Sequence, residues 1–195
     1  LTPEYVKGHV VKIEQMTSRI AKIIKGLRSF SRNSDKDPFS EFTIQSLLDD
    51  TLEFCRERFN NHSVKFSTNG DLSPTVLGRP TELSQVILNL LNNAFDAIQD
   101  QPQKWIKIES ENNLDWVKIK IIDSGHGIPK EIADRLMEPF FTTKSVGKGT
   151  GLGLSISKGI IEDHHGHFYL DSTGSNTCFV IELPRPISNT GSTTN

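Results

Sequence analysis

The sequence predicts an α+β domain preceded by a long helix, and three patterns in its 195 residues support this prediction. Apolar residues recur at heptad spacing over residues 4–32, which is typical of a helix in a bundle or coiled coil. From Phe39 onward, short alternating segments are interspersed with helix-periodic ones, as in a mixed α and β domain. Two glycine clusters between residues 123 and 153 hold six of the 14 glycines. Loops of this kind expose backbone N–H groups that can bind anions.

Composition and charge argue against several classes of protein. Hydrophobic residues make up 35% of the chain and the net charge is −2. No apolar run approaches the roughly eighteen residues that a membrane span needs. A near-neutral balance also argues against non-specific nucleic-acid binding, which needs a concentrated basic face. Cys55 and Cys178 fit no metal or CxxC spacing, so we expect two free core thiols in a reducing cytosol.

The first predicted element is a helix over residues 4–32. Its apolar seam consists of two series, Val6, Ile13, Ile20 and Leu27, and His9, Met16, Ile23 and Phe30. A helix with such a seam must pair with another surface, so the pattern predicts a homodimer through residues 4–32. We interpret His9 as a packed interface residue. The polar residues 33–38 form the predicted domain boundary.

The remaining elements alternate between strands and helices. Alternating segments predict strands at residues 39–42, 64–68, 75–77, 106–111, 117–122, 167–172 and 177–183. Polar and glycine-rich turns are expected at residues 69–74, 112–113 and 173–176. Helices are expected from Thr43 as N-cap to about Asn61, from Pro80 to about Asp100, from Pro129 to about Met137, and from Thr150 to about His164. The polar tail, residues 186–195, is expected to be disordered.

A polar stripe crosses the helix predicted to start at Pro80. Asn89, Asn93 and Asp96 stand at i, i+4 and i+7, on one face of a helix that is otherwise rich in Val, Ile and Leu. Helix interiors do not favour asparagine, so the stripe suggests a ligand-facing row, with a solvated face as the alternative. Amide oxygens suit Mg²⁺, which takes one or two protein oxygens beside phosphates and water.

The glycine clusters contain further polar groups. The first cluster is Asp123-Ser124-Gly125-His126-Gly127-Ile128, and the second runs from Gly147 to Leu154. Pro139-Phe140-Phe141-Thr142-Thr143-Lys144 lies between them. Glycine N–H groups at the start of a helix favour anions such as the polyphosphate of a nucleotide. The alternative is a mobile surface loop, but the acidic residue, the lysines and the threonines argue against it.

In this order, the four segments resemble the ATP-binding domain of sensor histidine kinases. That domain belongs to the GHKL superfamily, shared with type II topoisomerases, mismatch-repair ATPases and a class of heat-shock chaperones. The resemblance covers roughly residues 39–184 and implies the Bergerat fold, a two-layer α/β sandwich with a mixed sheet and helices on one face. Residues 1–34 resemble the second helix of the kinases' dimerisation and phosphotransfer hairpin, and residues 39–185 the catalytic domain.

The resemblance also implies roles for individual residues. Asn93 would hold Mg²⁺ and Asn89 would line the same site, while Asp123 would accept a hydrogen bond from the adenine amine. Asn89 and Lys144 would be the catalytic residues. Lys144 would neutralise phosphate charge. The implied ATP-binding residues are Asn89, Asn93, Asp96, Asp123, Gly125, Gly127, Ile128, Phe140, Thr143, Lys144, Gly147, Lys148, Gly149, Thr150, Gly151, Leu152, Gly153, Leu154 and Thr177.

Three positions refine the expected activity or depart from the family's pattern. Hydrolysing relatives carry a glutamate four residues before the magnesium asparagine, whereas this chain has Asn89, which cannot act as a general base. The chain should therefore present ATP to another nucleophile. His9 lacks the acidic residue that follows the family's acceptor histidine, so we expect the acceptor upstream of Leu1. Arg79 stands where such kinases often have aspartate.

The resemblance implies a response-regulator receiver domain as partner, and a cytoplasmic location, alone or as the cytoplasmic part of a membrane-bound sensor. Two alternatives remain. An anti-sigma-type serine kinase shares the ATP domain, although the heptad helix and the Phe-Phe-Thr-Thr-Lys segment speak against it. A non-catalytic ATP-sensing module would bind nucleotide without transfer, against which stand the intact Asn93, Asp123 and Lys144.

Overall fold

The computed structural model describes residues 5–7, 9, 10, 13, 16, 17, 38–145 and 149–186. All the described residues of the predicted helix 4–32 are helical, and the rest of that helix lies outside the described residues, as does the tail from 187. In the described part of the seam, Ile13 is 63% and Met16 67% exposed, so the predicted dimer remains a prediction. No helix in the described part of the chain is long and apolar enough to cross a membrane.

The chain divides into two compact units. The larger one consists of residues 37–129 and 157–195, and the smaller one of residues 1–36 and 130–156.

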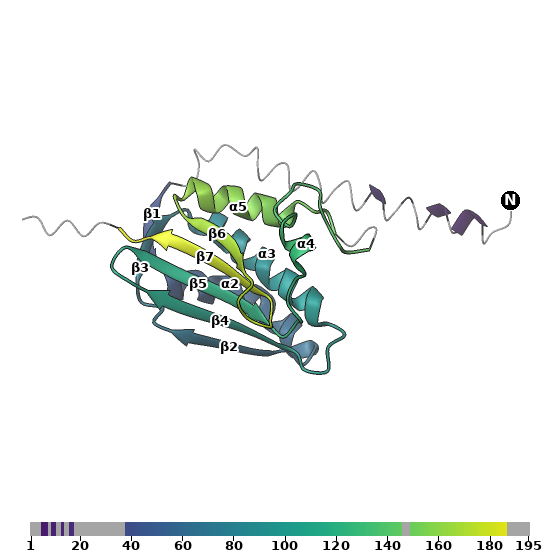
Figure 1. Cartoon of the computed structure of the whole chain (residues 1–195), viewed down its shortest axis with the longest axis horizontal. Coiled ribbons are helices and arrows are strands. Elements are labelled where there is room, and N and C mark those ends of the chain that lie inside the picture. The colour runs from purple at the N-terminus through teal and green to yellow at the C-terminus, as the bar shows by residue number, and fades with distance from the viewer. Residues whose placement is uncertain are drawn as a thin grey trace, which may run out of the picture. The chain divides into compact units, whose positions relative to one another are not determined.

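A five-stranded sheet forms the centre of the larger unit (Figure 1). Its strands, in the order β2-β4-β5-β7-β6, are β2 (Lys65–Gly70), β4 (Trp105–Asn112), β5 (Trp116–Asp123), β7 (Cys178–Pro184) and β6 (His167–Asp171). β2 pairs with β4 in parallel and the other pairs are antiparallel. Inward residues alternate along the strands, so that Ile106 and Ile108 of β4 are fully buried.

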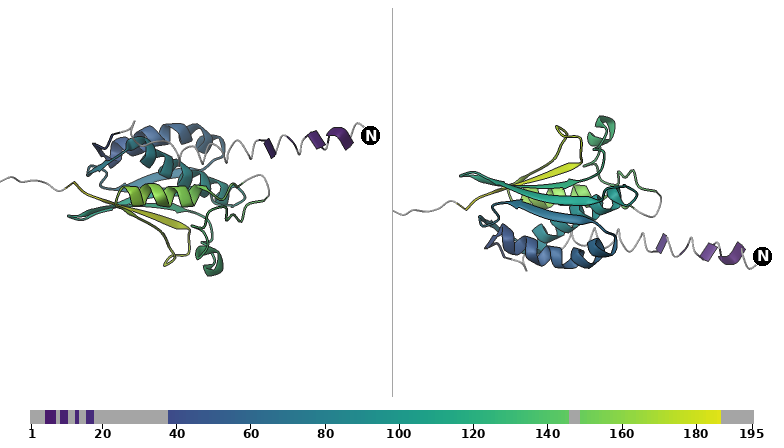
Figure 2. Two further views of the ribbon diagram at one scale, coloured as in Figure 1. Left: turned by 90° about the horizontal axis from the view of Figure 1, so that it is seen from above. Right: turned by 90° about the horizontal axis from the view of Figure 1, so that it is seen from below.

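Helices cover one face of this sheet, as both views of Figure 2 show. The helix α3 (Pro80–Ile98) packs on β4 and β5, and α2 (Ile44–Asn61) packs on α3 and β2. The core between the layers includes Leu83, Val86, Ile87, Leu90, Leu91, Phe95, Ile98, Val117, Ile119 and Ile121. The predicted mixed-sheet sandwich with helices on one face is confirmed.

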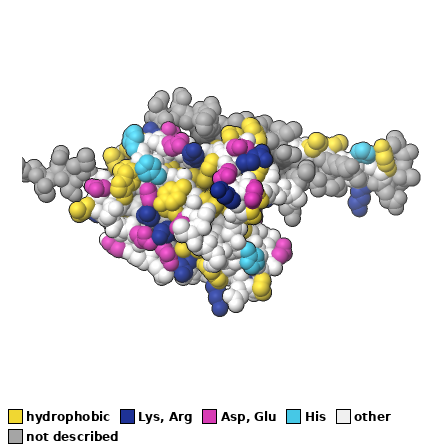
Figure 3. Space-filling view, viewed as in Figure 1, with side chains coloured by type: hydrophobic (Ala, Val, Ile, Leu, Met, Phe, Trp, Pro, Cys, Tyr) yellow, Lys and Arg dark blue, Asp and Glu magenta, His cyan; other side chains and the backbone are white. Residues whose placement is uncertain are grey.

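The opposite face of the sheet carries charges of both signs, which intermix over the strands (Figure 3). Lys118 pairs with Glu182 at 2.9 Å and Lys107 with Glu109 at 3.4 Å. These pairs are cross-strand or same-strand neighbours, so the face is largely neutralised by its own residues.

The structure confirms the predicted starts of α2 and α3. Thr43 is the N-cap of α2, and its side-chain oxygen accepts a hydrogen bond from the Ser46 N–H at 3.1 Å. Pro80 is the first residue of α3, where its missing N–H costs nothing. Before these helices, β1 (Ser40–Thr43) and β3 (Thr75–Gly78) form a separate antiparallel pair.

Several predicted boundaries were wrong by a few residues. β2 continues to Gly70, because Asn69 and Gly70 still pair with β4, so the turn predicted at 69–74 starts later. α3 ends at Ile98 instead of Asp100. The predicted helix 129–137 is only α4 (Lys130–Ala133), since hydrogen bonds beyond it change from the i−4 to the i−3 carbonyl.

The helix predicted from Thr150 begins later as well. It is α5 (Gly153–Asp163), because Gly151 has φ +69°, which no α-helix accommodates. The two cysteines are buried free thiols, as predicted.

Candidate functional site

Asp123 is the last residue of β5 and its side chain is only 3% exposed. The Gly125 N–H donates to the carboxylate Oδ1 at 2.8 Å, and the Thr177 side chain donates a second hydrogen bond. Thr177 directly precedes β7 and lies beside Asp123 because β7 pairs with β5. The Thr177 carbonyl accepts a hydrogen bond from the Asp123 N–H at 3.1 Å. The sheet register therefore brings together two residues that are far apart in the sequence.

Burial determines the charge state of this carboxyl. Desolvation raises the pKa of Asp123 from 3.8 to about 6, although the hydrogen bonds from Gly125 and Thr177 act in the opposite direction. At neutral pH the group is mostly ionised. A carboxylate has about four acceptor positions, so two donors leave room for the amine of a ligand.

The glycines of this loop are required by close contacts. A Cβ on Gly125 would lie 2.6 Å from Oδ1 of Asp123 and 3.3 Å from the Thr177 hydroxyl. Gly127 has φ +73°, a conformation that side chains rarely adopt. The Asn176 side chain donates to the Gly125 carbonyl at 3.0 Å, so the turn between β6 and β7 holds the loop.

A cavity of about 250 Å³ opens beside this loop. It is lined by His126, Gly127, Ile128, Pro129, Leu170, Asp171, Ser172, Gly174, Ser175, Asn176 and Thr177. Three of these, Gly127, Ile128 and Thr177, are predicted site residues.

The predicted polar stripe of α3 has two kinds of contact. Asn89 is half-buried, and its amide nitrogen donates to the Ser157 hydroxyl at 3.0 Å. Asn93 is half-buried one turn later. Asp96 is exposed and forms an ion pair with Arg58 of α2 at 3.3 Å, so this carboxylate contributes to the contact between two helices. Its part in nucleotide binding stays a prediction.

In the smaller unit, the described residues 140–145 and 149–152 precede α5, and a hydrogen bond between Phe140 and Gly151 closes the base of this segment. The Phe140 N–H donates to the Gly151 carbonyl at 2.8 Å, and both residues have positive φ, 68° and 69°. The Thr142 hydroxyl accepts from the Lys144 N–H at 3.2 Å. In the described part of this loop, Phe140 and Thr143 are exposed, while Lys144 and Gly149 are half-buried. Gly147 and Lys148 lie outside the described residues.

The second part of this segment leads into α5. The Thr150 hydroxyl accepts from the Leu152 N–H at 3.3 Å, and Gly153 begins the helix. Leu152 is buried and Leu154 half-buried. The N-terminus of α5 thus follows directly after a glycine-rich loop, the arrangement that suits an anion.

The structure brings Asp123, Gly125 and Thr177 into direct contact. The segment 140–154, predicted to hold phosphates, belongs to the other compact unit. The sequence analysis did not predict two polar contacts of the site, which join Ser157 to Asn89 and Asn176 to Gly125. Ser157 stands four residues before the buried Ile161, so a lone hydroxyl on the apolar face of α5 was the available signal.

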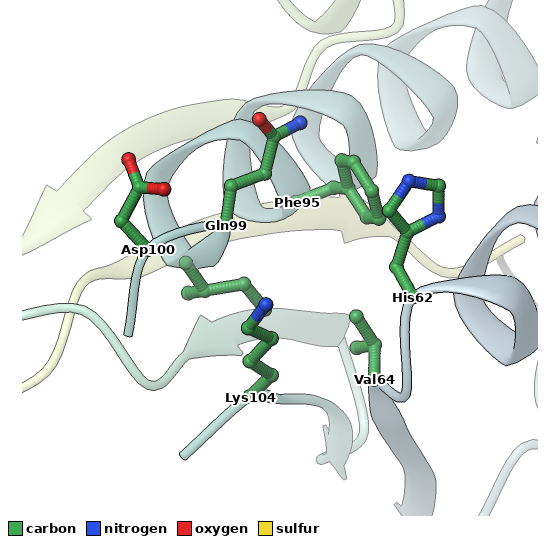
Figure 4. Close-up of a pocket in the computed structure, with 7 residues that line it drawn as sticks. His62, Val64, Phe95, Gln99, Asp100 and Lys104 are labelled. Carbon is green, nitrogen blue, oxygen red and sulfur yellow. The ribbon is translucent and has the colours of Figure 1, made fainter. Parts of the chain in front are cut away.

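A second cavity, of about 160 Å³, lies at the C-terminal end of α3 (Figure 4). It is lined by His62, Val64, Phe95, Ile98, Gln99, Asp100 and Lys104. None of these is a predicted site residue.

Comparisons with known proteins agree with the geometry. Residues 78–187 match the family "Histidine kinase-, DNA gyrase B-, and HSP90-like ATPase". The chain is 30% identical to the two-component sensor PprA of Pseudomonas aeruginosa, covering 94% of the chain and 20% of PprA. It is 34% identical to the sensor kinase CckA of Brucella abortus, covering 91% and 20%. The chain thus spans about a fifth of the length of these relatives.

Solved structures of histidine kinases are also similar to this chain. The nucleotide-free catalytic domain of the histidine kinase ThkA has a TM-score of 0.67 and 32% identity, covering 75% of this chain and 95% of that one. ThkA in complex with the response regulator TrrA has a TM-score of 0.73 and 30% identity, covering 95% and 53%.

Proposed function

The chain belongs to the histidine kinase-, DNA gyrase B- and HSP90-like ATPases, within the sensor histidine kinases, and from this we propose that it binds ATP–Mg²⁺ for phosphoryl transfer to a histidine. The observation that carries the proposal is the buried Asp123 carboxylate, framed by Gly125 and Thr177. Bound ATP supplies the γ-phosphoryl group and leaves as ADP.

In this proposal Asp123 accepts a hydrogen bond from the adenine amine. Its carboxylate is desolvated, and a charge-assisted hydrogen bond to such a group is worth about 1.5–3 kcal/mol. Because a Cβ on Gly125 would fill the space beside Oδ1, the loop fits a flat base that approaches the backbone closely. Gly127 and Ile128 line the same side, and Thr177 supports the carboxylate.

The cation and the phosphates are assigned to the asparagines and the glycine-rich segment. Asn93 and Asn89 provide amide oxygens, which suit a Mg²⁺ that takes most of its ligands from phosphate and water. Among the residues that the structure describes, no cluster of three His, Cys, Asp or Glu side chains could hold a metal ion. Lys144 and the N–H groups of residues 149–153 would neutralise phosphate charge, with Lys148 as a further cationic contact. Asp96 is proposed only as a further residue of the ATP site.

Transfer is favoured over hydrolysis because Asn89 cannot remove a proton from water. Positioning and electrostatic stabilisation therefore supply the catalysis. The acceptor is proposed to be a histidine outside this chain, and the phosphoryl group is then relayed to an aspartate of a response regulator. The ThkA structure contains its regulator TrrA, which supports this partner class.

The domain assignment follows from the same proposal. Residues 1–34 act as one helix of a dimerisation hairpin, residues 39–185 as the ATP-binding domain, and residues 186–195 as a tail. The exposed seam residues Ile13 and Met16 support a homodimer through the first helix. Free thiols at Cys55 and Cys178, together with the need for ATP, support a cytoplasmic location.

A labelling experiment tests the proposal. The chain is incubated with γ-labelled ATP, Mg²⁺ and a separately produced hairpin segment that carries an acceptor histidine. Acid-labile, base-stable label on the hairpin is expected, as phosphohistidine requires. Acid-stable label on a hydroxyl residue would instead indicate a serine kinase. ATP binding without any label would contradict transfer and leave an ATP-sensing module.

Two substitutions distinguish recognition of the adenine from binding of the cation. Asp123→Ala is expected to weaken ATP binding at least tenfold, with or without Mg²⁺, because the adenine loses a charged acceptor. Asn93→Ala is expected to weaken binding only when Mg²⁺ is present. Calorimetric titration in EDTA and in Mg²⁺ measures both. An Asn93→Ala variant whose affinity keeps the wild-type dependence on Mg²⁺ would contradict the ligand assignment.

A further inference from the structure

Asn176 lies in the turn between β6 and β7, and the proposed function assigns no role to its side chain. Its amide nitrogen donates a hydrogen bond to the Gly125 carbonyl at 3.0 Å. A backbone carbonyl can only accept, so this contact fixes which end of the amide faces the loop. Gly125 is buried, and a buried carbonyl without a donor is costly, so Asn176 supplies the partner that this peptide group needs.

Gly125 is held at both of its backbone polar groups. Its N–H donates to Oδ1 of Asp123 at 2.8 Å, while its carbonyl accepts from Asn176. The preceding Ser124 anchors the loop on the side of β4, because its hydroxyl donates to the Gln103 carbonyl at 2.8 Å. The orientation of the Gly125 N–H, which occupies one acceptor position of the carboxylate, therefore depends on a residue of the β6–β7 turn.

The same turn supports the Asp123 carboxylate through the next residue. The Thr177 side chain donates to the carboxylate, and the Thr177 carbonyl accepts from the Asp123 N–H at 3.1 Å. The Ser175 carbonyl lies against Gly127, where an added Cβ would come within 3.3 Å of it. Three consecutive residues of one turn thus contact the carboxylate and the loop that frames it.

The turn has internal support of its own. Asp171, the last residue of β6, accepts hydrogen bonds from the Thr173 N–H at 2.9 Å and from the Thr173 hydroxyl at 2.7 Å. These hydrogen bonds lower the pKa of the Asp171 carboxyl, so it remains an acceptor at neutral pH. The sheet fixes the ends of the turn, since Asp171 pairs with Cys178. Asn176 therefore projects from a support that is formed without a nucleotide.

We propose that Asn176 is a positioning residue for base selection, which holds the Gly125 carbonyl and thereby keeps the Asp123 carboxylate oriented toward the amine of adenine. This inference rests on the proposed function, in which Asp123 binds that amine. A carboxylate only accepts hydrogen bonds, so it attracts an amine and repels a carbonyl oxygen in the same place. The orientation of Asp123 therefore decides how strongly the site distinguishes the two kinds of base.

The variant Asn176→Ala and the matched control Asn60→Ala, at an exposed asparagine of α2, test the proposal. Calorimetry with Mg²⁺ measures the affinities for ATP and for inosine triphosphate, whose base carries an oxygen where adenine has its amine. The ratio of the two affinities reports on the carboxylate, since both nucleotides have the same phosphates and a loss of folded chain lowers both affinities alike. Asn176 has no positive φ, so alanine adds no backbone strain.

Asn176→Ala is expected to reduce the preference for ATP by about three- to tenfold, as for the loss of one hydrogen bond, whereas Asn60→Ala should keep it. Asn176→Asp keeps the shape of the side chain but cannot donate when ionised, so it should show the same loss. An unchanged preference in Asn176→Ala would overturn the proposal. A loss in Asn176→Asp alone would assign the effect to the added charge and would overturn it as well.

Failure of the proposed function gives a different result. A wild-type chain that binds no ATP, or that binds the two nucleotides equally, would refute the role of Asp123 itself. A wild-type chain that prefers ATP, together with an Asn176→Ala variant that prefers it equally, would refute only the role of Asn176.

A second measurement needs no nucleotide. Hydrogen exchange of the Gly125 and Asp123 N–H groups is followed by NMR in the wild-type chain and in Asn176→Ala. The Gly125 N–H is expected to exchange about tenfold faster in the variant, while the Asp123 N–H, bonded to the Thr177 carbonyl, should keep its protection. Unchanged exchange at Gly125 would overturn the proposal. Equal acceleration at both positions would show a general opening of this sheet end and would also overturn it.

Discussion

At the residue scale, ionisation of the buried Asp123 carboxyl lowers the stability of the folded chain. Burial raises its pKa from 3.8 to about 6, so the folded chain binds this proton more tightly than the unfolded chain. The contribution of this group to stability is therefore fully present below pH 3.8 and is lost as the pH rises through about 6. The same desolvated charge is what makes the carboxylate a strong acceptor for a ligand, which is a stability–function trade-off.

Asp123→Asn is expected to remove this pH dependence and to abolish tight ATP binding. The unfolding free energy of the variant minus that of the wild type should rise by up to about 3 kcal/mol between pH 4 and pH 8. Urea unfolding at several pH values measures the difference. Asp71→Asn is a control of opposite sign, because hydrogen bonds from Ser73 lower the pKa of Asp71. A constant difference for Asp123→Asn would refute the prediction.

At the element scale, the loop from Phe140 to Gly151 depends on its closed base. The Phe140 N–H donates to the Gly151 carbonyl, and a Cβ on Gly151 would overlap the Phe140 carbonyl group. The φ of Gly151, +69°, adds to the constraint. This pair, more than the loop's own sequence, sets where the glycine-rich segment ends and α5 begins.

Gly151→Ala is expected to open this base, with a local cost of about 1–3 kcal/mol for a strained alanine. Hydrogen exchange of the Phe140 amide should accelerate by at least tenfold, and ATP should bind more weakly. Gly174→Ala is the matched control, because a Cβ there would meet only the Asn176 nitrogen at 4.0 Å. Unchanged protection of the Phe140 amide in Gly151→Ala would contradict this account.

At the scale of the whole molecule, the fold was predictable where local signals decide it. Thr43, Pro80 and the alternation in β4 and β5 fixed helix starts and strand faces, and the predicted sandwich is confirmed. Asp123 was predicted as a site residue because it opens the first glycine cluster, and its expected role came from the resemblance to the kinase domain.

Contacts between distant elements were not predictable in the same way. The pairing of Ser157 with Asn89 and of Arg58 with Asp96 depends on how helices pack against each other, which periodicity does not encode. The late start of α5 depends on the positive φ of Gly151, which a glycine permits but does not require.

His164 shows how one side chain can join three distant parts of the larger unit. It is 1% exposed at the C-terminal end of α5, and its Nε2 accepts the Arg79 N–H at 2.9 Å. Its Nδ1 contacts the Ile160 carbonyl at 2.7 Å, and its ring packs on Phe39 with centroids 5.0 Å apart. A Cβ on Gly78 would come within 2.7 Å of the ring. The start of β1, the start of α3 and the end of α5 therefore share this contact.

His164→Ala is expected to lower the unfolding free energy by about 2–4 kcal/mol, because it creates a cavity and removes the acceptor of the partly buried Arg79 N–H. His164→Gln can place an oxygen near the former Nε2 and should recover part of the loss, whereas His164→Asn replaces only the Nδ1 side and should recover less. Urea unfolding ranks the three variants. Equal stability of the Gln and Asn variants would show that the Arg79 hydrogen bond contributes nothing and that His164 acts by packing alone.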